Sequence, residues 1–171
     1  MATGFPTKAN WVAGDILTAA QMDDLAGTLN LLSGYYTGNP SLTAPIEVGN
    51  VSATAATGTV NIDTKTSTYW YYTTNASANF TLNFRGNSTT TLSSILAVGS
   101  SISVVFLNTN GATAYYANAF QVDGVAVTPK WAGGTAPTAG SASAIDAYTF
   151  TIIKTAATPT YTVLAGAVKF A

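Results

Sequence analysis

Residues 131–150 read WAGGTAPTAGSASAIDAYTF, and this stretch decides the fold class. A Trp is followed by two glycines and then by a Pro, a combination that ends one element and turns the chain. After a loop of small residues, Asp146 opens a segment in which Tyr148, Phe150 and Ile152 alternate with other side chains. Alternation at every second residue is typical of a strand with one buried face. The stretch therefore predicts a turn followed by a strand of an all-β domain.

Short strand signals separated by turn signals continue through the C-terminal two thirds of the chain. Asn110-Gly111 and Asp123-Gly124 each lie between apolar segments and predict two-residue hairpins. Residues 91–98 predict a short helical turn. Evenly spaced short strands indicate an antiparallel β-sandwich, jelly-roll-like in form. The expected strands are 57–64, 67–74, 79–85, 100–108, 112–118, 120–128, 145–154 and 159–169.

Before this domain we expect an irregular arm and one short α-helix. Thr18 and Gln21 have the spacing of a capping box, which would start a helix over 19–32. The larger apolar residues of that segment recur at a/d spacing and are Met22, Leu25, Leu29 and Leu32. Such a stripe fits a helix that self-associates, and it also fits one amphipathic helix lying on a core. The expected units are an attachment arm with its helix (1–34), a linker (35–56) and the β-sandwich domain (57–171).

The composition excludes several classes of function. Only 8% of the residues are charged and the formal net charge is −1, so nothing attracts nucleic acid or an anionic membrane. The chain has no Cys and no His, which removes disulfides, thiolate chemistry and the commonest general base. No apolar run is long enough for membrane insertion, and the first residues do not have the pattern of a secretory signal.

The carboxylates do not form a catalytic or metal-binding motif. They are Asp15, Asp23, Asp24, Glu47, Asp63, Asp123 and Asp146. Asp123 is expected in a turn and Asp146 at the end of a loop, and no motif pairs any two of the seven. We therefore expect no enzymatic activity, no cofactor and no metal site, while a metal shared between symmetry-related copies stays open as an alternative.

The aromatic residues are the candidates for contact with another molecule. Tyr69 and Tyr71 should face one side of a strand, and Trp70 and Tyr72 the other. One side should be core, and the other could contact a glycan or a neighbouring subunit, although a strand buried on both sides is the simpler interpretation. The pair at 115–116 (Tyr115 and Tyr116) has the same ambiguity. We interpret the Trp at 131 as a plug at one end of the sandwich.

Two stretches of the sequence resemble bacteriophage virion proteins. Residues 131–150 resemble the "W-x-GG-x-x-P … D-x-Y-x-F" element that closes a small sandwich in the C-terminal β-domain of many phage tail-fibre and virion appendage proteins. Residues 11–22 resemble the "F/W-x-x-G-D/E-x-L-T-A-x-x-[ML]-N" segment that opens many phage tail and minor virion proteins. The usual Asn of that segment is replaced here by Asp23 or Asp24.

The resemblance implies a virion structural protein that docks by its N-terminus and projects a β-domain for attachment or assembly. The docking residues would be Trp11, Gly14, Asp15, Leu17 and Thr18. The expected partners are further copies of the chain in a homotrimer, other virion proteins of the tail, adaptor or capsid, and a host surface glycan. The protein would be in the virion, on the tail rather than the capsid surface, and in the host cytoplasm before assembly. A capsid decoration or head-fibre protein is an alternative, and a carbohydrate-binding module is an alternative of another class.

Overall fold

The structure is a computed structural model that describes residues 46–171. The predicted docking segment, helix and apolar stripe, and the linker up to residue 45, lie outside the described residues. The predictions for Trp11, Gly14, Asp15, Leu17, Thr18, Met22, Leu25, Leu29 and Leu32 therefore stay predictions.

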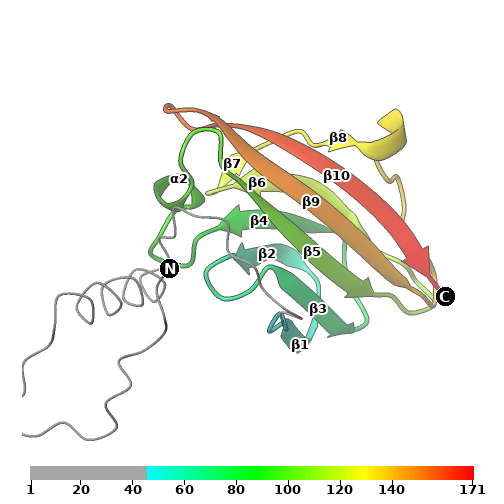
Figure 1. The fold of residues 1–171 in the computed structure, drawn as a ribbon. Coiled ribbons are helices and arrows are strands. Elements are labelled where there is room, and N and C mark those ends of the chain that lie inside the picture. The colour runs from blue at the N-terminus through cyan, green and yellow to red at the C-terminus, as the bar shows by residue number, and fades with distance from the viewer. Residues whose placement is uncertain (1–45) are drawn as a thin grey trace, which may run out of the picture. The chain divides into compact units, whose positions relative to one another are not determined.

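The described residues form two β-sheets that pack on one another (Figure 1). The six-stranded sheet has the order β1-β3-β5-β9-β10-β8, and the four-stranded sheet has the order β2-β4-β6-β7. The strands are β1 (Asn50–Ala55), β2 (Gly58–Asp63), β3 (Tyr69–Thr74), β4 (Phe80–Arg85), β5 (Ser101–Thr109), β6 (Ala117–Val122), β7 (Val125–Ala126), β8 (Lys130–Trp131), β9 (Ile145–Ala156) and β10 (Thr160–Phe170). Two short helical turns, α2 (Leu92–Ile95) and η1 (Ala132–Gly134), lie in the connections. The predicted all-β sandwich is confirmed.

The pairing within the sheets is mixed, where the sequence had predicted antiparallel strands throughout. β1, β3 and β5 are parallel, and so are β2, β4 and β6. The reason is that the chain changes sheet after each of the first five strands, so consecutive strands face each other across the core. A strand in the opposite sheet then serves as the crossover that a parallel pair requires. Only β5, β9 and β10, and the β6–β7 hairpin, are antiparallel.

The two predicted hairpins have different outcomes. Asp123 and Gly124 join β6 to β7 in a hairpin, and both have positive φ, 51° and 79°, as a type I′ turn requires. Asn110-Gly111 instead follows the last residue of β5. The backbone N–H of Asn110 donates a hydrogen bond to the Ala144 carbonyl at 2.9 Å. The chain there passes to the other sheet, because both sides of β5 are already paired with β3 and β9. No strand forms over 112–116, and β6 starts at Ala117.

The linker prediction also needs correction, because β1 lies in its last residues. The small residues of β1 do not give the apolar alternation that predicts a strand. β1 forms because the edge of β3 is available for parallel pairing. The other predicted strands, which correspond to β2, β3, β4, β5, β9 and β10, are confirmed within a few residues.

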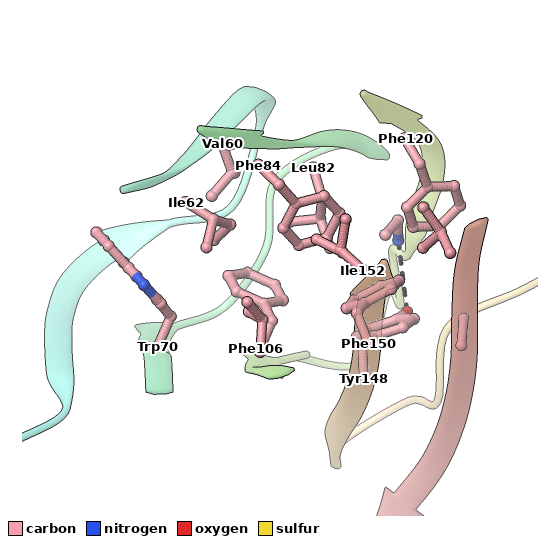
Figure 2. Packing of buried hydrophobic residues seen from close by; sticks show 14 of the residues in the cluster. Val60, Ile62, Trp70, Leu82, Phe84, Phe106, Phe120, Tyr148, Phe150 and Ile152 are labelled. Atoms are coloured by element: carbon pink, nitrogen blue, oxygen red, sulfur yellow. Dashed lines mark hydrogen bonds between the residues drawn. The ribbon is translucent and has the colours of Figure 1, made fainter. Parts of the chain in front are cut away.

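Aromatic rings form a large part of the core between the sheets, beside aliphatic side chains such as Ile62, Leu82 and Ile152 (Figure 2). Phe106 of β5 packs against Phe80 of β4, with ring centroids 5.6 Å apart, and Phe84 packs against Phe150 of β9 at 4.8 Å. Figure 2 also shows Tyr148, whose hydroxyl accepts a 3.4 Å hydrogen bond from the Ala117 backbone N–H. Burial raises the pKa of the Tyr148 phenol far above its usual value.

Two charged side chains hold α2 from its opposite ends. The Asp123 carboxylate accepts hydrogen bonds from the backbone N–H groups of Leu92 and Ser93, at 2.6 and 2.9 Å. The ammonium group of Lys154, a residue only 7% exposed, donates to the carbonyls of Ser93 and Leu96, at 2.7 and 3.0 Å. A negative charge at the first N–H groups and a positive charge at the last carbonyls satisfy the groups that a short helix leaves unpaired. The connection between β4 and β5 is thereby fixed to both β6 and β9.

Candidate interaction surfaces

The outward face of the six-stranded sheet is the largest candidate surface. Alternation along the strands places the following side chains opposite the core: Val51, Tyr69, Tyr71, Ser101, Ser103, Val105, Leu107, Thr109, Ile145, Ala147, Thr149, Thr151, Ile153, Thr162, Leu164, Gly166, Val168 and Phe170. We call these residues the outward face. None of them is charged, and Lys130 on the edge strand β8 borders them.

Large apolar side chains on the outward face are open to solvent. Val51 is 65% exposed at one side of the sheet, and Leu164, Val168 and Phe170 are 45%, 57% and 58% exposed along β10. Between them lie hydroxyl-bearing and half-buried apolar residues of β5 and β9. Exposed apolar residues grouped on a face without charge are typical of a surface that contacts another protein.

The aromatic strand β3 contributes to both faces, as its alternation predicts. Trp70 is buried and its indole N–H donates to the Ser67 carbonyl at 2.8 Å. The Tyr72 ring packs on Phe106 at 5.3 Å, and burial raises the pKa of its phenol. Tyr69 and Tyr71 are half-buried on the outward face. Trp70 and Tyr72 are therefore core residues, and the prediction of an external contact concerns Tyr69 and Tyr71.

The Tyr69 ring lies close to Gly49, the residue that precedes β1. A Cβ atom at Gly49 would overlap with the Tyr69 ring, so this position needs a residue without a side chain. The ring thereby extends the outward face toward β1 and Val51.

Tyr115 and Tyr116 lie apart from the outward face, on the connection between β5 and β6. Both are half-buried and pack against the core. Their backbone N–H groups donate to the side-chain oxygens of Asn110 and Asn79, each at 3.1 Å. The structure does not bring this pair together with Tyr69 and Tyr71 on one face.

The two halves of the 131–150 stretch are joined in the structure. Trp131 is half-buried and makes edge-to-face contacts with Phe120, at 5.5 Å, and with Phe150, at 6.3 Å. Gly133 and Gly134 turn the chain with φ values of 73° and 79°, which only glycine adopts readily. Trp131 therefore packs on the core beside a Gly-Gly turn, as predicted, but it is half-buried and does not form the fully buried plug that the sequence predicted.

A carboxylate closes the loop that follows this turn. Asp146 is 6% exposed, and its Oδ2 atom accepts hydrogen bonds from the Ser141 backbone N–H and the Asn110 side-chain amide, both at 2.9 Å. The Oδ1 atom of Asn110 in turn accepts from the Asn108 amide at 3.1 Å. Asp146 thus ties the returning loop to the start of β9 and to the end of β5.

The returning loop leaves a groove of about 480 Å³ beside the ends of β9 and β10. Its walls include Pro137 from the loop, Trp131 from β8, Asp146 and Tyr148 from β9, and Lys169 from β10. Sequence reasoning missed this groove, because it depends on where the loop returns. The signal that could have indicated it is the length of the small-residue loop, since long ordered loops are often functional.

The described carboxylates do not converge on one site. Asp63 pairs with Arg85, Asp123 caps α2 and Asp146 binds the loop. Within residues 46–171, no group of three Asp, Glu, His or Cys side chains is placed to hold a metal ion. No helix in that same range is long and apolar enough to cross a membrane.

Comparison of the chain with protein-family models, with curated proteins and with solved structures found no match.

Proposed function

We propose that this chain is a bacteriophage virion structural protein, a tail fibre or appendage that docks by its N-terminal segment and projects the β-sandwich. The resemblance of residues 11–22 and 131–150 to such proteins supports the proposal. Among the described residues, the outward face supports the assembly part of this proposal. Its exposed apolar side chains would contact water in a free monomer, and contact with another protein would bury them.

The outward face is large enough for a contact between copies. Strands lie about 4.8 Å apart and outward residues about 6.8 Å apart along a strand, so each covers about 33 Å² of the sheet plane. The outward positions together span about 600 Å², which is close to the roughly 800 Å² of accessible surface that each partner buries in a standard interface. Because none of these outward residues is charged and Lys130, opposite Leu164, lies only at the edge of the sheet, bringing two copies together desolvates little charge.

The test is the mass of the full-length protein in solution, measured by light scattering coupled to size-exclusion chromatography. We expect an oligomer, a trimer in the leading form of the proposal. Replacing Leu25 and Leu29 with Asp places charges on the predicted helical stripe and should reduce the mass. Replacing Val51 and Leu164 with Lys tests the outward face in the same way. Val125→Lys is the matched control, because Val125 is 69% exposed on β7 of the other sheet.

A wild-type monomer would contradict the oligomeric fibre and favour the carbohydrate-binding module. An oligomer that survives all four substitutions would show that neither surface is the interface. Imaging of labelled protein on phage particles distinguishes a tail position from a capsid decoration or head-fibre position, and absence of label from particles would overturn the virion assignment.

A further inference from the structure

The groove beside β9 and β10 has the features of a ligand site, and it adjoins the outward face, because Ala147, Thr149, Gly166 and Val168 line it as well. Its volume of about 480 Å³ is within the range of about 300–1,000 Å³ that is typical for small-molecule sites. It is formed by the loop that Asp146 holds in place through Ser141, so its far wall is anchored by a partly buried hydrogen bond of 2.9 Å.

The polar wall of the groove combines a carboxylate with an ammonium group. Oδ2 of Asp146 is occupied by Ser141 and Asn110, whereas Oδ1 receives no hydrogen bond from residues 46–171. Lys169 lies opposite Asp146 in the β9–β10 register and is exposed, and the two side chains do not form an ion pair. The groove thus offers one acceptor and one donor that are not committed to each other.

The remaining walls are apolar and include an aromatic ring. Trp131, a half-buried residue that also packs against Phe120 and Phe150, lines the groove. Pro137 and several alanines of the loop complete the apolar wall. An indole beside hydrogen-bonding groups suits a ligand that has an apolar side and a polar edge.

We propose that this groove binds a neutral hexose. The Asp146 carboxylate accepts hydrogen bonds from ring hydroxyls, the Lys169 ammonium donates to another, and the C–H face of the sugar packs against Trp131. The carboxylate and the ammonium at the same wall offset each other's charge, so neither an anion nor a cation gains a net attraction there, whereas a neutral ligand with hydroxyl groups satisfies both groups. The inference does not rest on the virion assignment, and it places the glycan contact at the groove, away from Tyr69 and Tyr71.

The test is saturation-transfer NMR on the full-length protein with glucose, galactose and mannose, each at concentrations up to about 10 mM, where a dissociation constant near 1 mM is readily seen. We expect transfer to the C–H protons of at least one hexose. Glucuronate and glucosamine should give weaker signals than the neutral sugar. No transfer to any of the three hexoses, or stronger transfer to a charged sugar, would overturn the proposal.

Two variants locate the site. Ala167 is exposed and lines the groove, so Ala167→Leu fills the groove without removing a contact and should weaken binding at least tenfold. Asp146→Asn keeps an oxygen for Ser141 but removes the charge, and it should weaken binding by a similar factor. Ala126→Leu, the same change at an exposed position of β7, should leave the affinity unchanged. If Asp146→Asn does not fold, Ala167→Leu decides alone, and unchanged affinity in that variant contradicts the proposal.

Discussion

Trp131→Ala should lower the free energy of unfolding by about 4 kcal/mol. The side chain is half-buried, so the substitution exposes roughly 100 Å² of apolar surface, which corresponds to about 2.5 kcal/mol. The edge contacts with Phe120 and Phe150 add about 0.5–1 kcal/mol each beyond the area. The sum is a large share of the roughly 5–15 kcal/mol that stabilises a typical domain. Trp131→Phe keeps one ring against the core and should cost about 1 kcal/mol.

Equilibrium unfolding in guanidinium chloride, followed by far-UV circular dichroism, measures this change. Circular dichroism is preferable to fluorescence because the substitution removes one of three Trp residues. The measurement should be repeated at two protein concentrations, since association would add to the apparent stability. Val125→Ala is the control, because Val125 is 69% exposed, and should change the free energy by less than about 0.5 kcal/mol. An equally small change for Trp131→Ala would refute the reasoning and show that the ring does not stabilise the fold.

The remaining predictions concern the buried charges and phenols. Asp123→Ala removes the acceptor for two N–H groups of α2 and should lower the free energy of unfolding by about 1–2 kcal/mol. Asp123→Asn should lower it less, because Asn keeps one side-chain oxygen and tolerates positive φ. Thermal melts of the two variants measure the difference. Lys154→Met leaves the carbonyls of Ser93 and Leu96 without their donor and should cost about 1–3 kcal/mol in the same melts, and a stability equal to wild type would mean that water replaces the ammonium. Burial raises the pKa of Tyr72, Tyr148 and Tyr161, so the unfolded chain loses these protons at lower pH than the folded protein does. The free energy of unfolding should therefore be at its full value below the unfolded pKa of about 10 and should fall as the pH rises above it. Urea titrations at rising alkaline pH check this, and a stability that stays flat while tyrosinate absorbance appears would contradict it.

Much of the fold could be predicted because the local patterns, apolar alternation and turn residues, agree with the tertiary structure around them. Phe80, Leu82 and Phe84 alternate with polar residues and form a strand with one buried face. Asp123-Gly124 sits between two such segments, and a turn that needs two residues with positive φ is a property of the residues themselves. The Gly-Gly turn after Trp131 is local in the same sense.

The partner of each strand could not be predicted, because alternation records which face is buried and not which strand lies alongside. The same pattern in β1 to β6 fits antiparallel hairpins or strands that cross between sheets, and only the packed core, with Phe80 of β4 against Phe106 of β5, selects the second. Asn110-Gly111 has a hairpin sequence but follows a strand that is paired on both sides, so tertiary pairing overrides the turn preference.

The candidate sites were likewise predictable only in part. The sequence by itself determined that Tyr69 and Tyr71 share a face opposite to Trp70 and Tyr72, because successive residues of a strand point to opposite sides. It also determined that little charge was available to cover any surface. Only the tertiary structure decided that the outward faces of β1, β3, β5, β9 and β10 form one uncharged surface, since this depends on strand order. Only the tertiary structure brought Asp146, Lys169 and Trp131 around one groove, because the residues come from three strands, β9, β10 and β8, whose contacts are not encoded by their spacing in the sequence.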